Sequence, residues 1–452
     1  MSKGVVIPLR EQFAPAPLPE NGKGFYIWTI GCQMNEADSF RVGAMLQEAG
    51  YRPVESETNA DIVILNSCVV RQAAEDKVTG RLNSLIREKR HRPEMSLVLT
   101  GCMVTNQHEA LRDRFPHVDL FFDPSDFDAF KRFVPELNEL EDDLETLPHY
   151  YVDQVADARV SAYVPIIYGC NFVCSYCIVP YRRGRERSRP MDEIVLEVKH
   201  LVERGVRDVT LLGQTVNAYG HDLESGSGLS DLLRAVDAVP GLDRLRFLTS
   251  HPKYMSDDIL EAMAELPSVC EHLNLPVQAG NNVVLKRMRR TYAVEVWEER
   301  IAKARDLMPG LTVATDIIVG FPGETDEQFA DTLDVLRRVE LDKVHVAMYS
   351  PRPGTLSARW NDDIPASVKH ERHSAVEQLQ EEVCTRLNAS RLGTAVDVLF
   401  DSFNKGRWGG RSRGNTLVHV DHSGNLLGKI APVQVVETSP WYLIGELTGE
   451  PR

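Results

Sequence analysis

The sequence predicts an α/β protein in three parts: an N-terminal α/β domain with a parallel sheet, a central partial (β/α) barrel, and a small C-terminal all-β barrel. β-rich runs alternate with helical stretches over most of the chain, which is the order typical of parallel sheets. Near the C-terminal end the runs become short and are separated by Gly-rich turns, as in small all-β modules. The chain has 452 residues, enough for about three domains.

The N-terminal α/β domain is expected at 24–139. Its candidate strands are 25–30, 61–66, 96–100 and 118–122. Before it, residues 1–23 hold prolines and mixed charges, which predicts a disordered tail. After it we expect an acidic linker at 140–155, because residues 135–150 contain six acidic side chains and no Lys or Arg.

The central barrel is expected at 156–387 and the all-β module at 388–450. Six runs recur at intervals of roughly 30–45 residues, which fits the strands of a (β/α) barrel. They are 163–169, 208–213, 244–250, 271–277, 312–321 and 343–350. The module's candidate strands are 396–401, 416–420, 433–437 and 442–447.

Composition excludes several classes of protein. Charges interrupt every apolar run before the roughly 18 residues that a membrane span needs, so no membrane association is expected. The first residues lack the apolar core of a targeting signal, which makes the cytoplasm the expected location. A net charge of −15 argues against a purely electrostatic nucleic-acid coat protein. Eight cysteines are too few for a disulfide scaffold.

Three cysteines, Cys170, Cys174 and Cys177, form a C-x3-C-x2-C motif just after a predicted strand. Three thiolates on one loop leave one iron of a [4Fe–4S] cube without a protein ligand, open to a substrate or cofactor. The alternative is a structural zinc completed by a distant residue, since no fourth ligand follows nearby.

A second set, Cys32, Cys68 and Cys102, is dispersed, but each cysteine directly follows a predicted strand. The carboxyl ends of parallel strands meet at one edge of a sheet, so we expect these thiols to converge there. Three ligands again favour a cluster with an open iron. Cys270 and Cys384 lack such a pattern and are expected in the core.

The C-x3-C-x2-C region strongly resembles the radical S-adenosylmethionine (SAM) enzymes. With the dispersed cysteines and the small β module, residues 24–450 are similar to the methylthiotransferases. GCQMNEADS at Cys32 resembles the MiaB branch, which modifies adenosine 37 of tRNA, and NSCVVRQAAE, SRPMDEI, TSHP, GFPGE and SPRPGT agree with it. Asn274 departs from the family, which commonly has His there.

The resemblance implies a radical SAM cluster on Cys170, Cys174 and Cys177 and an auxiliary [4Fe–4S] cluster on Cys32, Cys68 and Cys102. It also implies two SAM molecules per turnover and an external electron donor. One SAM would donate a methyl group to sulfur. The other would supply the radical that removes hydrogen from C2 of the adenine in N6-isopentenyladenosine, giving the 2-methylthio product.

Further site residues follow from the same resemblance. Tyr176 matches the aromatic position beside the adenine of SAM. Other candidate SAM contacts stand at the ends of later strands, with structural packing as the alternative for each: Gln214, Ser250, Gln278 and Asp316. The β module resembles a TRAM domain, which binds RNA.

Three basic islands, 181–190, 285–290 and 404–413, interrupt the acidic background, and arginines there can hold RNA phosphates while an aromatic side chain stacks on a base. The alternative for each island is a solvated, salt-bridged surface. The candidate residues are Arg183, Arg185, Arg407, Trp408, Arg411 and Arg413. The expected partner is the anticodon loop of tRNA, and the expected state is a monomer.

Three alternative functions stay open. Two are methylthiotransferases that act on threonylcarbamoyl-adenosine in tRNA or on an aspartate of ribosomal protein S12. The third belongs to a different class, a non-catalytic iron–sulfur regulator that binds RNA. Cleavage of SAM to 5′-deoxyadenosine would exclude the regulator, and analysis of tRNA nucleosides would separate the enzymes.

Overall fold

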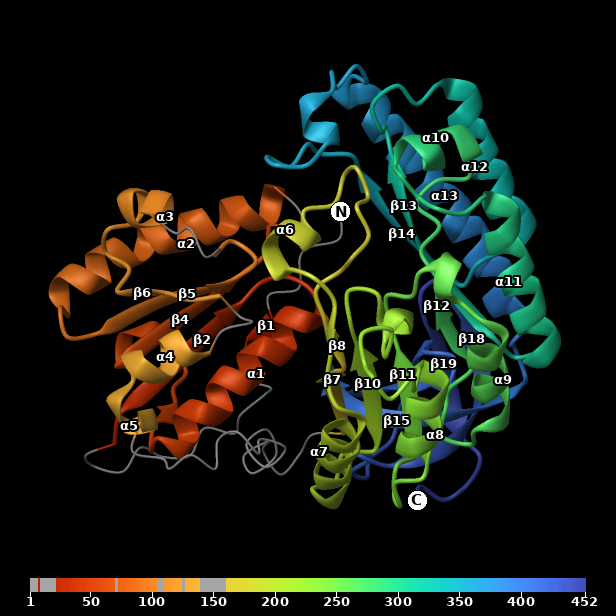
Figure 1. Ribbon diagram of the computed structural model, residues 1–452. Helices are drawn as coiled ribbons and strands as arrows, with labels where there is room; N and C mark the ends of the chain where they lie inside the picture. Colours follow the sequence, from red (N-terminus) through yellow and green to blue (C-terminus); the bar gives the residue numbers. More distant parts are fainter. Residues whose placement is uncertain (1–6, 9–21, 70–71, 105–108, 124–126, 139–159) are drawn as a thin grey trace. The chain divides into compact units, whose positions relative to one another are not determined.

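The computed structural model describes residues 7–8, 22–69, 72–104, 109–123, 127–138 and 160–452 (Figure 1). It divides into two compact units. The first comprises Met1–Asp157, Tyr163–Asn171 and Ile178–Arg204, and the second comprises Ala158–Ala162, Phe172–Cys177 and Gly205–Arg452. The predicted acidic linker and most of the predicted tail lie outside the described residues.

The first unit contains the predicted parallel sheet. Its strands run in the order β1-β2-β4-β5-β6, and β3 pairs with β2. They are β1 (Ile7–Pro8), β2 (Gly24–Thr29), β3 (Arg52–Pro53), β4 (Ile62–Ser67), β5 (Ser96–Gly101) and β6 (Leu120–Phe121). All these pairs are parallel except β1 with β2. Because β4 is central and buried on both faces, the first four residues of its sequence IVILNS are all apolar.

Helices cover both faces of this sheet, with α2 and α3 on one side and α1, α4 and α5 on the other (Figure 1). They are α1 (Gln33–Glu48), α2 (Gln72–His91), α3 (Glu109–Arg114), α4 (Asp128–Phe133) and α5 (Pro135–Asn138). Alternate residues of β4 explain the two layers. Val63 and Leu65 pack with Leu82 of α2, whereas Ile62 and Ile64 pack in the separate core of α1.

The first unit also holds the segment around the C-x3-C-x2-C motif. Its elements are β8 (Ile167–Tyr168), α6 (Val179–Arg183), β9 (Arg187–Ser188) and α7 (Met191–Glu203), and β7 (Ser161–Pro165) has residues in both units. β8 and β9 are antiparallel. Ile178, just before α6, packs in the same core as Val78, Leu82 and Leu85 of α2.

The second unit contains the parallel strands of the partial barrel. They are β10 (Asp208–Leu212), β11 (Arg244–Phe247), β12 (His272–Asn274), β13 (Thr312–Val319) and β14 (Lys343–Met348). β10 pairs with β11, and β13 pairs with both β12 and β14.

The helices between and after these strands are α8 (Leu229–Asp237), α9 (Asp257–Glu265), α10 (Asn282–Arg287), α11 (Val294–Leu307), α12 (Asp326–Val339) and α13 (Ala366–Ala389). Short 3-10 turns lie at Glu57–Asn59 in the first unit and at Val216–Ala218, Pro252–Tyr254 and Ser357–Arg359 in the second.

The C-terminal module is a closed five-stranded barrel in the order β15-β16-β17-β19-β18. Its strands are β15 (Ala395–Asn404), β16 (Arg407–Ser412), β17 (Leu417–Val420), β18 (Ile430–Thr438) and β19 (Leu443–Leu447). The inward residues, such as Phe400, Val418 and Val433, form its core. This confirms the predicted small all-β barrel.

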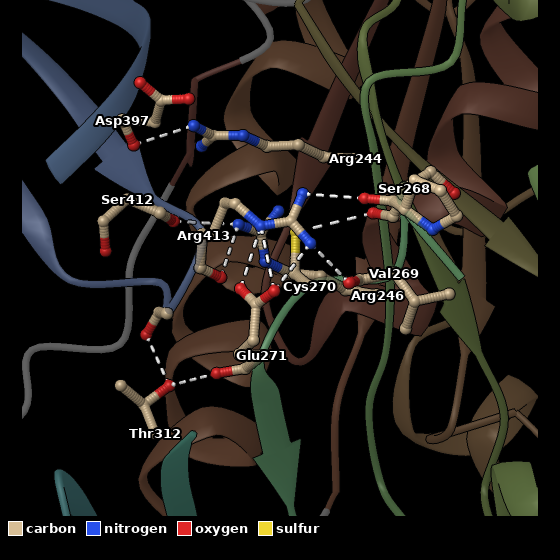
Figure 2. A network of polar contacts seen from close by, with 12 residues as sticks. Arg244, Arg246, Ser268, Val269, Cys270, Glu271, Thr312, Asp397, Ser412 and Arg413 are labelled. Atoms are coloured by element: carbon tan, nitrogen blue, oxygen red, sulfur yellow. Dashed lines mark hydrogen bonds and ion pairs between the residues drawn. The ribbon is translucent and has the colours of Figure 1, made fainter. Parts of the chain in front are cut away.

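Three arginines attach this barrel to the core strands (Figure 2). Arg244 of β11 donates to the carbonyls of Asp397 and Arg411, and Arg246 donates to the carbonyl of Ser412 at 2.9 Å. In the opposite direction, Arg413 Nε donates to Glu271 Oε2 at 2.8 Å. The turn between β16 and β17 is therefore fixed to the amino ends of the core strands. None of the helices in the described ranges combines the length and apolar composition needed to cross a bilayer.

Candidate active site

Cys32, Cys68 and Cys102 lie at one edge of the N-terminal sheet. They follow the neighbouring parallel strands β2, β4 and β5, whose carboxyl ends open on that edge. The thiols of Cys32 and Cys102 lie 3.6 and 4.0 Å from Asn35 Oδ1. Cys68 Cβ lies 3.0 Å from the position that a Cβ on Gly31 would take. The structure thus brings together three cysteines that are far apart in the sequence.

Two glycines shape the loops that carry these thiols. Gly31 and Gly101 directly precede Cys32 and Cys102, and their φ angles are +144° and +91°. Side chains are rarely tolerated in this region. A Cβ on Gly101 would also come well within 3.0 Å of the Ser67 carbonyl oxygen. Glycine therefore precedes each of these cysteines because the backbone turns there with a positive φ.

Asn35, in the first turn of α1, ties these loops together. Its Nδ2 donates to the carbonyl oxygens of Ile30 and Ser67 at 3.3 and 2.7 Å, and to Asn66 Oδ1 at 3.0 Å. In return, Asn66 Nδ2 donates to the Asn35 carbonyl at 2.7 Å. These bonds fix the carboxamide so that its oxygen faces the thiols.

Arg183, at the end of α6, reaches the same edge from a distant part of the sequence. Its Nη2 donates to Asp38 Oδ2 at 2.9 Å and to Asn35 Oδ1 at 3.2 Å. Burial raises the pKa of Asp38 and that of the Cys102 thiol, and the Arg183 charge opposes both rises. We expected Arg183 among the RNA contacts, and the structure places its guanidinium beside the cysteines. No sequence pattern links it to them.

The cysteines of the C-x3-C-x2-C motif are divided between the two units. Cys170 belongs to the first, and Cys174 and Cys177 belong to the second. The Cys177 N–H donates to the Cys174 carbonyl at 3.1 Å, which is the tight turn that the C-x2-C spacing requires. Arg290 Nη1 lies 3.4 Å from Cys174 Sγ, so this thiol also has an arginine as a neighbour.

Ser175 anchors this loop within the second unit. Its N–H donates to the Met288 carbonyl at 3.0 Å, and its Oγ donates to the Arg287 carbonyl at 2.9 Å. Its own carbonyl accepts from the Ser357 N–H at 2.8 Å. The loop between Cys174 and Cys177 is therefore held by three backbone partners from distant segments.

Three of the five candidate SAM contacts follow strands of the second unit. Gln214 follows β10, Ser250 follows β11, Gln278 follows β12, Asp316 lies in β13, and Tyr176 stands between two cysteines. Gln278 has a φ of +77°, which is unusual for a residue with a side chain and typical of functional sites. Its N–H donates to the Asp316 carbonyl at 2.9 Å, and the ring of Tyr176 meets Phe321 edge-on.

Ser250 offers a buried hydroxyl to a bound group. Its Oγ has no hydrogen-bond partner within the described part of the chain, although the residue is only 3% exposed. The side chain of Asn274 helps to place it, because Asn274 Oδ1 accepts from the Thr249 N–H at 2.9 Å. A buried polar group without a partner is costly, so this hydroxyl fits a site completed by a polar cofactor.

The predicted RNA contacts differ in their surroundings. Arg185, Arg407 and Arg411 are exposed, and Arg407 Nε donates to Asp421 at 3.0 Å. Trp408 is half-buried. Arg413 instead donates to Glu271 and to the carbonyls of Pro267 and Val269 (Figure 2).

Phe403 was missed at the sequence level. It is 57% exposed, and its ring packs on Trp408 with centroids 4.9 Å apart. Its signal in the sequence is an aromatic residue at the end of a strand beside a basic turn.

The donors available for iron are soft thiols. Within the described ranges, no group of three or more His, Cys, Asp or Glu side chains is arranged to hold a metal ion. The cysteines of a [4Fe–4S] cube are spread over different irons, and their thiolates match iron–sulfur chemistry. Three convergent cysteines with an arginine beside them fit such a group.

Similarity to known proteins agrees with this arrangement. Residues 24–123 match the uncharacterized protein family UPF0004, and residues 164–336 match the radical SAM superfamily. The tRNA-2-methylthio-N(6)-dimethylallyladenosine synthase of Chloroflexus aurantiacus is 47% identical over 93% of this chain and 91% of its own length. This chain belongs to the same family. The synthase of Herpetosiphon aurantiacus is 44% identical over 94% of this chain and 98% of its own.

Membership of this synthase family confirms the resemblance inferred from the cysteine motifs. Solved structures agree on the fold. The radical SAM methyltransferase TsrM of Kitasatospora setae has a TM-score of 0.55 at 15% identity, covering 71% of this chain and 70% of its own. The cobalamin-dependent enzyme OxsB has a TM-score of 0.50 at 11% identity, covering 80% of this chain and 56% of its own.

Proposed function

We propose that this chain is a radical SAM methylthiotransferase that adds a methylthio group to C2 of N6-isopentenyladenosine at position 37 of tRNA. The observation that carries the proposal is the pair of cysteine sets in a chain nearly half identical to named synthases over almost its full length. When bound, two [4Fe–4S] clusters and SAM would supply the sulfur, methyl and radical chemistry.

The residues of the first unit would hold the auxiliary cluster. Cys32, Cys68 and Cys102 would be its ligands, and the convergence of their loops supports this role. Asn35 fixes the relative positions of two of these loops through its bonds to Ser67 and Asn66. Three protein ligands leave one iron position for the sulfur that is transferred.

The residues of the second unit would orient SAM. The unpartnered Ser250 hydroxyl and the left-handed backbone at Gln278 support a cofactor contact at these strand ends. Cys170, Cys174 and Cys177 would be the ligands of the radical SAM cluster. An external electron donor would reduce it.

The C-terminal barrel would hold the anticodon loop. Phe403 and Trp408 offer aromatic surface for an unstacked base, and Arg407 and Arg411 offer cations for phosphates. Arg185 adds an exposed cation outside the barrel. We propose that the chain acts as a monomer, and in the cytoplasm, where its tRNA substrate is found.

The test is incubation of the reconstituted protein with SAM, a reductant and tRNA that carries N6-isopentenyladenosine, followed by mass spectrometry of the nucleosides. We expect 2-methylthio-N6-isopentenyladenosine. Cys102→Ala should abolish this product but retain cleavage of SAM to 5′-deoxyadenosine. Cys270→Ala, which removes a similarly buried thiol outside both sets, should retain product. If product forms only from threonylcarbamoyl-adenosine or from ribosomal protein, the proposed substrate is wrong and the reaction class stands. If SAM is not cleaved, the non-catalytic iron–sulfur regulator is favoured.

A further inference from the structure

A buried ion pair stands beside the dispersed cysteines. The side chains of Arg183 and Asp38 are 5% and 4% exposed, and their closest atoms are 2.9 Å apart. Arg183 lies in the five-residue helix α6, and Asp38 lies 145 residues earlier in α1. A buried ion pair contributes little to stability compared with well-packed apolar side chains, so its position is more informative than its energy.

That position is the open edge of the sheet. Arg183 Nη2 shares an acceptor, Asn35 Oδ1, with the thiols of Cys32 and Cys102. Unlike the exposed Arg185, two residues further on, Arg183 is turned toward the cysteine loops. Coulomb interactions act strongly here because little water screens them.

The charge of the site follows from these contacts. Cluster ligands are thiolates, and three of them outweigh the positive charge of an oxidised [4Fe–4S] core, so the loaded site is negative and becomes more negative on reduction. Asp38 adds another negative charge when it is ionised. Arg183 contacts this group directly and is held in place by two oxygen acceptors, and the Arg41 charge also acts on Asp38. A fixed cation near an iron–sulfur group favours its reduced state, because the added electron is stabilised.

We propose that Arg183 is a positioning residue of the auxiliary site, where its fixed charge raises the reduction potential of the cluster on Cys32, Cys68 and Cys102. This inference rests on the proposed function, since it requires a cluster at that site. It assigns Arg183 to the cysteine site in place of the phosphate contact expected from its basic sequence context. Asp38 holds the guanidinium in position, and its negative charge reduces the shift in potential that the Arg183 charge produces.

The test uses the full chain with Cys170, Cys174 and Cys177 all replaced by Ala, so that only the auxiliary cluster can form. Iron is counted after anaerobic reconstitution, and the midpoint potential is measured by a redox titration followed by electron paramagnetic resonance. Arg183→Gln should shift the potential to a more negative value with iron retained. Arg183→Lys should restore part of the shift, because it keeps the charge.

A second variant covers the case in which Arg183→Gln fails to fold or to bind iron. Asp38→Asn removes the opposing charge and should shift the potential to a more positive value. The matched control is Arg185→Gln, which should leave the potential unchanged and weaken tRNA binding, whereas Arg183→Gln should leave tRNA binding unchanged. Opposite shifts at residues 183 and 38 would be difficult to explain by a structural role alone.

Two results overturn the inference, and they are distinguishable. Full iron content with an unchanged potential in both Arg183→Gln and Asp38→Asn removes the role of Arg183 and leaves the proposed function intact. Absence of iron in the parent that lacks Cys170, Cys174 and Cys177, with Arg183 present, removes the auxiliary cluster and this inference with it.

Discussion

Gly101 and Gly80 mark two extremes among the glycines of the first unit. Gly101 has a positive φ and Ser67 backbone atoms against it, whereas nothing lies within 4 Å of a Cβ added at Gly80 in α2. The backbone at Gly101 therefore requires glycine, whereas the helix at Gly80 has room for a larger side chain. Alanine substitutions at the two positions can be compared directly, because both lie in the first unit.

Gly101→Ala should destabilise the protein by about 1–3 kcal/mol, through backbone strain and the clash with Ser67, and should reduce iron bound by the dispersed cysteines. Gly80→Ala should be stabilising by up to about 1 kcal/mol, since alanine favours the helix. Denaturant unfolding and iron analysis of both variants check this. Equal stability of the two variants would contradict the role given to Gly101.

Ser250→Ala separates a cofactor contact from a structural role. Its hydroxyl has no partner in the described part of the protein, so its loss should leave the melting temperature unchanged or higher. A lost hydrogen bond of about 1.4 kcal/mol would weaken SAM binding about tenfold. Ser268→Ala is the control, because Ser268 Oγ donates to Asp237 at 2.6 Å and its loss should lower stability while SAM binding is kept. Isothermal titration with SAM and thermal unfolding are the measurements.

His272 predicts a pH dependence of stability. Burial, followed by the Arg246 charge, lowers the pKa of His272 to about 3. The unfolded chain therefore takes up this proton first, near its ordinary pKa of 6.5, and the free energy of unfolding falls as the pH drops below that value. The fall attributable to His272 approaches about 1.4 kcal/mol per pH unit. His272→Gln should unfold with a weaker pH dependence between pH 6 and 5 in urea titrations, and an unchanged slope would contradict the assignment.

At the scale of the elements, strand β16 and the turn that follows it carry two arginines with different roles, Arg411 in the strand and Arg413 in the turn. Arg413 is bound to Glu271, which keeps the pKa of that carboxyl low despite burial. Arg411 is exposed. Arg413→Ala should lower stability by about 1–3 kcal/mol, because it leaves Glu271 without its partner. Arg411→Ala should stay within about 0.5 kcal/mol of the parent and weaken tRNA binding. Chemical unfolding measures the stability role of Arg413, and filter binding measures the tRNA contact of Arg411. A large loss of stability in Arg411→Ala would contradict the roles given to the two arginines.

The elements were largely predictable, because each is encoded locally. A strand that is followed directly by a cysteine, such as the one before Cys102, can be predicted from its apolar run and the glycine that precedes the cysteine. The partners of arginines in long-range ion pairs were not predictable, since Arg183 contacts Asp38 across 145 residues and Arg413 contacts Glu271 across 142. A run of arginines such as 181–190 contains no local signal that distinguishes the buried member from the exposed ones.

At the scale of the whole molecule, an acidic protein must bind an acidic polymer. The net charge is −15, so tRNA must be held by local cations against a general repulsion. Arg185, Arg407 and Arg411 are the exposed cations among the predicted contacts. If each meets one phosphate, the logarithm of the association constant should fall with the logarithm of salt concentration at a slope of about 2–3. Binding that is insensitive to salt would exclude these contacts.

The attachment of the C-terminal barrel also has a consequence for substrate choice. Arg244, Arg246 and Arg413 fix it to the strand ends through its own backbone, so its aromatic pair cannot drift relative to the core. If this pair binds the anticodon loop as proposed, the protein sets the distance from the bound loop to the core strands. We therefore expect the enzyme to select its substrate by loop length, and to reject anticodon loops longer or shorter by a single nucleotide.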